Sequence, residues 1–258
     1  MSEIINLYKQ IGETPYQAIL KFKQKYPEYQ KEKISCAGRL DPLAQGVLLL
    51  LIGDENKNRL YYEKLRKNYE FEILFGVCTD TYDLLGEIKK SSSIFNTNLS
   101  ELQKQIAEIM PSFIGKQSQL YPPYSAVRVK GHPLFYWSRH KKLNSINIPQ
   151  HQIEIYNLKI LDNYLITIKN LEEVVTKNIN KVEGNFRQKE ILETWQVFYK
   201  EYRGKEIPIL KMEISCTSGT YVRQFIHDIG KKLKIPTVTF SIKRTAIGSY
   251  EIKESVKI

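Results

Sequence analysis

Residues 35–57, SCAGRLDPLAQGVLLLLIGDENK, place a short polar turn directly before an apolar run. The turn holds Gly38, Arg39 and the pair Asp41–Pro42, and the run extends from Val47 to Ile52. A continuous apolar run bounded by turn residues is typical of a buried strand. The sequence therefore predicts a carboxylate, Asp41, held on a tight turn beside the core, where it could take part in catalysis.

The same turn also has a purely structural interpretation. Asp is a preferred helix N-cap and Pro a preferred first helical residue, so Asp41–Pro42 could simply begin a helix. From the pair alone, this interpretation is the commoner one.

The composition describes a basic globular protein. Of 258 residues, 42% are hydrophobic, and 39 Lys and Arg outweigh 28 Asp and Glu to give a net charge of +11. The length allows one large domain or two small ones with a real core. The surplus of positive charge fits a polyanionic partner such as nucleic acid, although basic globular proteins without such a partner are common.

Cysteine and histidine spacing argues against disulfides and metal sites. The three cysteines are far apart with no C-x-x-C pair, and the four histidines show no ligand spacing, so we expect a reducing compartment and no metal. The chain has neither a basic segment followed by an apolar one at its start nor an apolar run near the roughly 18 residues of a membrane span. We therefore expect a soluble, cytoplasmic protein.

The residues around Asp41 carry a more specific signal. Their order, G-R-L-D-P-L-A-x-G-V-L, resembles the catalytic motif of the TruB-type pseudouridine synthases, in which the Asp is essential. Residues 67–81, with Lys67, Tyr69, Gly76 and T-D-T at 79–81, are similar to the second motif of that family, whose tyrosine lies in the active site. From the residues alone, Tyr69 could be a core aromatic on one face of a half-buried strand.

Residues 121–134, YPPYSAVRVKGHPL, resemble the third signature of the same family. Arg128 and Lys130 lie in this aromatic and basic segment, which would suit stacking on RNA bases and contact with phosphates. Lys141 and Lys142 follow it and could also hold the RNA backbone. An edge hairpin with packed tyrosines explains the same residues equally well.

Residues 216–230, CTSGTYVRQFIHDIG, resemble the Arg-bearing motif of the family, with Arg223 as its arginine. In isolation, Arg223 would more usually be a surface or salt-bridge residue. Residues 240–248 resemble the last core strand of the family and include Ile242.

The resemblance covers nearly the whole chain and implies an α+β fold, with a mixed, largely antiparallel sheet and flanking helices, in a single catalytic domain over residues 1–258. Residues 171–205 have no counterpart in the compact bacterial pattern. We expect them to form a helical insertion, two helices broken near Gly184, that could be removed. Many bacterial members continue after the last core strand into a small RNA-binding PUA domain, which we expect to be absent here.

The activity that the resemblance implies is the conversion of a uridine in RNA to pseudouridine, without metal or organic cofactor. Asp41 would act as a nucleophile or a base, and Arg223 would keep it ionised. Tyr69 would lie on the base and help to remove the proton at C5. The resemblance also implies that Tyr221 and Ile242 form walls of the pocket. Lys57 matches a lysine that lies near the site in the family.

A uridine in the TΨC loop of tRNA is the expected target, with the protein acting as a monomer. One departure bears on the substrate, because the bacterial pattern has G-H-T-G before the Asp pair and this chain has S-C-A-G at 35–38. Two alternatives stay open. One is a non-catalytic RNA-binding or tRNA-folding protein on the same scaffold, and the other is a synthase that acts on another RNA.

Overall fold

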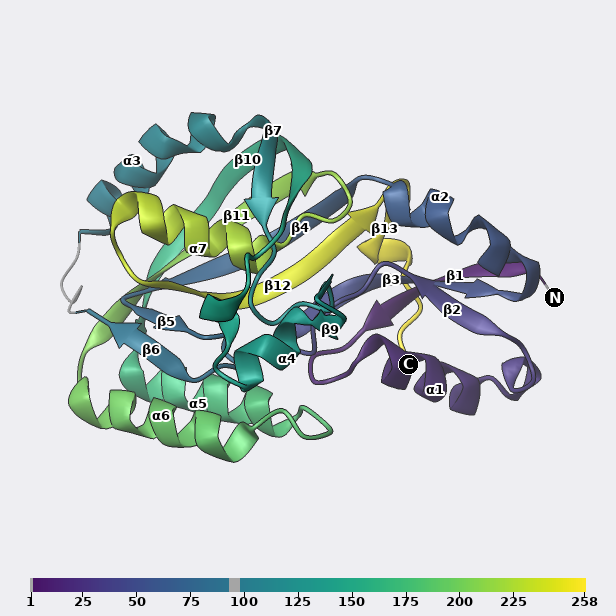
Figure 1. Ribbon diagram of the computed structural model, residues 1–258, viewed down its shortest axis with the longest axis horizontal. Coiled ribbons are helices and arrows are strands. Elements are labelled where there is room, and N and C mark those ends of the chain that lie inside the picture. The colour runs from purple at the N-terminus through teal and green to yellow at the C-terminus, as the bar shows by residue number, and fades with distance from the viewer. Residues whose placement is uncertain (1, 93–97) are drawn as a thin grey trace.

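The computed structural model describes residues 2–92 and 98–258 (Figure 1). Within these residues, its centre is a nine-stranded sheet in the order β1-β3-β12-β4-β11-β10-β7, with β2 paired to β3 and β13 to β12. Only β3 and β12 pair in parallel among these described strands. The expected mixed, largely antiparallel sheet is confirmed. The strand bounds are Glu3–Lys9 (β1), Ile34–Ala37 (β2), Ala44–Ile52 (β3), Lys67–Phe75 (β4), Gly115–Leu120 (β7), Gln150–Thr167 (β10), Glu206–Cys216 (β11), Thr237–Ile247 (β12) and Tyr250–Glu251 (β13).

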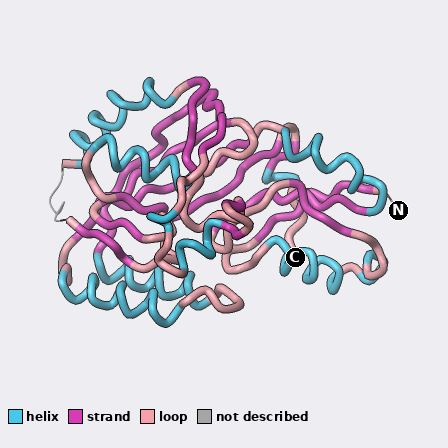
Figure 2. The backbone as a smooth tube through the Cα atoms, viewed as in Figure 1, coloured by secondary structure: helices cyan, strands magenta, loops and turns pink. Residues whose placement is uncertain are grey.

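Helices flank the sheet, and two small hairpins lie outside it. The larger part of the sheet lies between the helices α3 and α7 on one face and α5 and α6 on the other, so that strands and helices form layers (Figure 2). The hairpins are β5–β6 and β8–β9. The bounds are Pro15–Lys25 (α1), Arg59–Lys64 (α2), Leu99–Ile109 (α3), Leu134–Arg139 (α4), Ile168–Asn180 (α5), Gln188–Glu201 (α6), Val222–Leu233 (α7), Val77–Thr79 (β5), Ile88–Ser91 (β6), Arg128–Val129 (β8) and His132–Pro133 (β9).

Alternation along β4 divides its side chains between the two faces. Tyr69, Phe71 and Ile73 lie in the cluster beneath α7, whereas Leu74 belongs to the cluster beneath α5 and α6. Phe71 meets Phe225 of α7 edge-on, with ring centroids 5.9 Å apart. The expected common face of Tyr69, Phe71 and Ile73 is confirmed, because successive side chains of a strand point to opposite faces.

The helical stretch after β10 forms α5 and α6, as expected, but it packs as part of the core. Leu171, Ile179 and Trp195 are fully buried in one cluster with Leu74 of β4 and Val238 of β12. Removal of the pair would expose this face of the sheet to water. That the stretch is a removable insertion stays a prediction, and its burial against the sheet indicates that removal would destabilise the protein.

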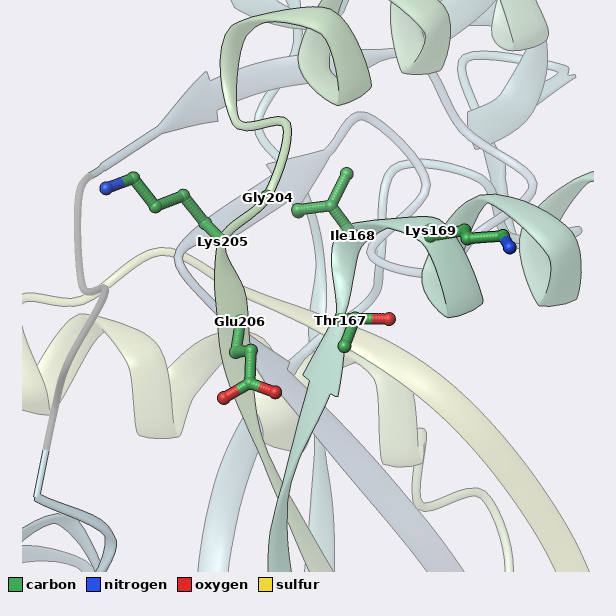
Figure 3. Close-up of a pocket in the computed structure, with 6 residues that line it drawn as sticks. All are labelled: Thr167, Ile168, Lys169, Gly204, Lys205 and Glu206. Atoms are coloured by element: carbon green, nitrogen blue, oxygen red, sulfur yellow. The ribbon is translucent and has the colours of Figure 1, made fainter.

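The pair enters and leaves the sheet at adjacent strand ends. Thr167 of β10 pairs with Glu206 of β11, and the Ile168 N–H donates to the Lys205 carbonyl at 3.0 Å. Figure 3 shows these two strand ends side by side, around a cavity that none of the candidate site residues line. The chain thus leaves a continuous pair of strands, forms two helices and returns to its starting point.

Among the described residues, no helix has both the length and the apolar character needed to cross a membrane.

Candidate active site

Asp41 lies on the turn that leads into β3. Its carbonyl accepts a hydrogen bond from the Ala44 N–H at 3.0 Å, which closes the turn, and the chain continues directly as the strand. The interpretation of Asp41–Pro42 as a helix start is therefore wrong. The side chain keeps 40% of its surface exposed, so the carboxylate can meet a ligand.

Arg223 holds that carboxylate with two parallel hydrogen bonds. It lies in the first turn of α7 and its side chain is only 4% exposed. Nε donates to Oδ2 of Asp41 at 2.7 Å, and Nη2 donates to Oδ1 at 3.1 Å, across 182 residues of sequence. Such a two-point contact fixes both the position and the plane of the carboxylate.

The remaining donors of Arg223 anchor it in the protein. Nη1 donates to the Thr81 carbonyl at 2.6 Å, Nη2 also reaches the Tyr124 carbonyl at 3.4 Å, and Oδ2 of Asp83 lies 3.6 Å from Nε. Burial alone would lower the pKa of Arg223, but Asp41 and Asp83 more than offset it, so the pKa is raised. The guanidinium therefore stays charged and fixed in place.

Asp83 is the second carboxylate beside Arg223, and it is enclosed. It accepts hydrogen bonds from the Thr81 hydroxyl at 2.7 Å and from the Leu85 N–H at 3.0 Å. Burial raises the pKa of Asp83, Arg223 opposes that rise, and Asp41 adds to it. Of the two carboxylates on Arg223, Asp41 is the one open to a ligand.

Tyr69 lies near the start of β4, in the same buried cluster as Leu40, Ala44 and Ile242. It is 9% exposed and is paired across the sheet with Arg244 of β12. Burial raises the pKa of Tyr69, and the charge of Arg244 opposes the rise. Its phenol is therefore protonated at neutral pH.

Tyr221 and Ile242 flank the same site from two other elements. Ile242 pairs in parallel with Ala44 and is 7% exposed. Tyr221 is the N-cap of α7, and the Gln119 side chain bonds both its N–H, at 2.8 Å, and its carbonyl, at 3.1 Å. Burial raises the pKa of Tyr221, and the Asp41 carboxylate raises it further. Tyr221 therefore lies within electrostatic range of Asp41, and Ile242 lies opposite Ala44, where the Asp41 turn enters β3.

Lys57 is not part of this group. It lies in the 3₁₀ helix Gly53–Asn58, its side chain is 79% exposed, and its ammonium group pairs with Asp54 at 2.5 Å. That helix follows the far end of β3, whose nine residues span roughly 25 Å at about 3.3 Å per residue. The lysine expected near the site therefore lies at the opposite end of the strand from Asp41.

Two buried basic side chains outside the predicted site residues brace the Asp41 turn. Lys9 of β1 is fully buried and its ammonium donates to the carbonyls of Ala44 at 2.7 Å and Pro42 at 3.3 Å. Burial lowers the pKa of Lys9 to about 7, although Glu13 and Asp41 oppose that shift. Arg244 donates to the Val47 carbonyl at 2.7 Å and to the Arg39 carbonyl at 3.2 Å. Both side chains fix the backbone that presents Asp41.

A different sequence signal could have identified Lys9 and Arg244. Lys9 and Arg244 each lie in a strand with apolar neighbours, and a cation at such a position requires backbone acceptors nearby once the strand is buried. Which carbonyls supply them depends on how distant strands pair.

Arg128 and Lys130 lie on the β8–β9 hairpin, and both are exposed. Residues 128–142 contain five Lys and Arg and no Asp or Glu. Aromatic rings accompany the charges, since His132 stacks on Tyr136 with centroids 4.2 Å apart. Tyr124, whose carbonyl meets Arg223, lies four residues before the hairpin. The chain therefore connects a basic, aromatic surface directly to the Asp41 site.

Over residues 2–92 and 98–258, no three His, Cys, Asp or Glu side chains are grouped so that they could hold a metal ion.

Comparison with solved structures shows the fold. The chain superposes on a chain of a Cbf5-Nop10-Gar1 complex with a TM-score of 0.58 and 17% identity, covering 99% of this chain and 52% of that one. A second match, an H/ACA RNP bound to a substrate RNA containing 2′-deoxyuridine, has a TM-score of 0.55 and 16% identity, covering 98% and 50%. This chain thus spans about half the length of the chains it matches.

Comparison with sequences shows the family. Residues 23–176, more than half of the chain, match the model of the TruB family pseudouridylate synthase, N-terminal domain. A tRNA pseudouridine synthase B of Ligilactobacillus salivarius is 30% identical, with 98% of this chain and 69% of the relative covered. That of Thermosipho melanesiensis is 27% identical, with 99% and 67% covered. The chain therefore belongs to the TruB family of pseudouridylate synthases, which are isomerases.

Proposed function

We propose that this protein converts a uridine within tRNA to pseudouridine, and that the Asp41–Arg223 pair is its catalytic centre. The observation that carries the proposal is a partly exposed carboxylate held in two-point contact by a buried guanidinium. The relatives described above are tRNA pseudouridine synthases B, which supports tRNA as the substrate class. The TΨC loop remains the expected target.

The reaction breaks the bond from C1′ to N1 and forms a bond from C1′ to C5. N1 gains a proton and C5 loses one, so the conversion is an isomerisation and needs no oxidant or reductant. A carboxylate can serve as the nucleophile or the base that starts it. Arg223 contributes by orientation, because it holds the two oxygens of Asp41 in one plane while part of the carboxylate stays accessible.

Tyr69 lies in the apolar cluster beside Asp41, which suits a ring on which the detached base can rest. We propose that its hydroxyl assists removal of the C5 proton. Because burial raises the pKa of the phenol, Tyr69 would begin as a hydroxyl, and its oxygen would accept the C5 proton while the hydroxyl gives its own proton to solvent. Tyr221 and Ile242 would complete the walls that retain the free base.

The β8–β9 hairpin would bind the RNA around the target. A stacked uridine must be flipped out before reaction, at an expense of roughly a few kcal/mol, and phosphate contacts can offset that energy. Arg128 and Lys130 are exposed on the hairpin and suit such contacts. We propose that the protein binds its RNA as a monomer, with an affinity that falls as salt concentration rises.

Tritium release from C5-labelled tRNA transcripts tests the function directly. The parent protein should release tritium, and Asp41→Asn should release none above background while it still binds the transcript, because an amide keeps the shape but not the charge. Asp162→Asn, a change at an exposed position, is the matched control and should keep the parental rate. Asp41→Asn turnover equal to that of the parent would remove Asp41 from the mechanism, and a parent protein without release would favour an RNA-binding role.

A further inference from the structure

The turn between β5 and β6 supports Arg223. It includes Thr81, whose carbonyl accepts a hydrogen bond from Arg223, and Asp83, whose carboxylate lies beside the same guanidinium. The turn is closed at its base by the Asp80 N–H, which donates to the Glu87 carbonyl at 3.0 Å, and by the Glu87 N–H, which donates to Oδ1 of Asp80 at 2.9 Å.

A residue from the helical pair binds this base from outside. Arg187 lies in the loop that joins α5 to α6, the loop that extends from the helix ends in Figure 1. Its Nη1 donates to Oδ2 of Asp80 at 2.9 Å and to Oε1 of Glu87 at 2.7 Å. The three side chains are between 15% and 26% exposed, so water screens the contact only in part.

Arg187 also reaches the second segment that supports Arg223. Its guanidinium carbon lies 4.8 Å from the centre of the Tyr124 ring, and the Tyr124 hydroxyl donates to the same Oδ2 of Asp80 at 2.9 Å. The Tyr124 carbonyl in turn accepts from Arg223. Asp80 therefore joins Arg187 to both segments that contact the buried guanidinium.

Removal of the positive charge of Arg187 would leave the Asp80 carboxylate without its ion pair to this residue. Asp80 and Glu87, which now share one nitrogen atom, would face each other without the cation between them, although Glu87 would keep its ion pair with Lys89 at 2.8 Å. Like charges at short range repel, and partial burial strengthens that repulsion. The base of the turn would open, and Thr81 and Tyr124 would shift relative to Arg223.

We propose that Arg187 is a positioning residue that holds Thr81 and Tyr124, and through them Arg223, in the arrangement that presents Asp41. The helical pair would then serve the reaction as well as the core. The inference rests on the proposed catalytic role of Asp41 and Arg223. A displacement of reacting groups by about 1 Å can lower a rate by about a hundredfold, so a small shift at this turn suffices.

Two substitutions separate the ionic contact from the shape of the side chain. Arg187→Gln removes the charge, and we expect the single-turnover rate of tritium release to fall roughly ten- to a hundredfold with the dissociation constant for tRNA unchanged. Arg187→Lys should restore most of the rate, because a single nitrogen atom makes both carboxylate contacts. A lysine variant as slow as the glutamine variant would contradict the assignment.

A matched control separates positioning from loss of stability. Leu171→Ala leaves a cavity in the buried face of the same helical pair and does not alter the contacts of Asp80. It should lower the unfolding temperature, while the rate stays near that of the parent. If Leu171→Ala slows the reaction as much as Arg187→Gln does, or if Arg187→Gln is as fast as the parent, the positioning role is overturned.

Hydrogen exchange of residues 79–87 distinguishes failure of this inference from failure of the proposed function. Arg187→Gln should speed exchange in this peptide, where the Glu87 and Leu85 amides are now bonded to carboxylates, and Arg187→Lys should not. A parent protein without tritium release would refute the function, while unchanged exchange in the glutamine variant would refute the positioning of the turn.

Discussion

Replacing Arg223 with lysine keeps one positive charge but removes the planar guanidinium that makes two hydrogen bonds to Asp41. Three nitrogen atoms of Arg223 now serve both carboxylate oxygens of Asp41 and the Thr81 carbonyl. A single ammonium group placed against one oxygen of Asp41 leaves the other oxygen and the carbonyl without these donors. A hydrogen bond to a charged group contributes about 1.5–3 kcal/mol, and the loss of one from the oriented carboxylate corresponds to a fall in rate of about a hundredfold.

The substitution should also reduce stability, because Asp83 is buried beside Arg223 and would keep a weaker partner. We expect a loss of about 1–3 kcal/mol in the free energy of unfolding. The rate is measured as single-turnover tritium release, at a temperature where both proteins are folded, and stability is measured by urea unfolding. Arg59→Lys is the control, since Arg59 forms a surface ion pair with Glu63 that contributes only about 0–1 kcal/mol. An Arg223→Lys protein as fast as the parent would refute the reasoning and place Arg223 outside the reaction.

Three further outcomes follow from burial and charge. Tyr69→Phe should bind RNA and break the glycosidic bond but release tritium more slowly, and an unchanged single-turnover rate would leave Tyr69 as packing alone. The pKa of Lys9 is about 7 in the folded protein against an ordinary 10.5. Between these values the unfolded chain binds more protons, so stability should rise with pH by about 1 kcal/mol per unit, and Lys9→Met should remove that part of the slope in urea titrations at pH 7.5 and 9. Trp195→Ala, at a fully buried site, should destabilise the protein by about 3–5 kcal/mol, whereas Val197→Ala, on the exposed side of the same helix, should change the unfolding free energy little.

Local patterns in the sequence predicted those parts of the site that depend on local structure. The turn before an apolar run placed Asp41 beside a buried strand, and alternation placed Tyr69 on the face of Phe71. The pairing of Asp41 with Arg223 was predicted only through a family resemblance, because no local rule joins residues 182 positions apart.

The remaining features depend on which distant surfaces meet. The sequence predicted two helices within residues 171–205, but it did not predict that α5 and α6 cover Leu74 and Val238 of the central sheet. For the same reason the sequence did not predict that Lys9 and Arg244 bind the Asp41 turn, since their acceptors are carbonyls of another strand or turn. Lys57 was predicted near the site from a motif match alone. In the structure it follows β3, and the length of that strand separates it from Asp41.

The position of β12 has a consequence for the order in which the protein can fold. This strand, Thr237–Ile247, is the last long strand of the chain, yet it lies between β3 and β4 in the middle of the sheet. While the chain emerges from a ribosome, β3 and β4 therefore each have an unpaired edge until β12 has been synthesised. Unpaired apolar strand edges can form hydrogen bonds with other chains. Nascent chains that stall before residue 237 should be targets for chaperones, because their two half-sheets cannot yet close.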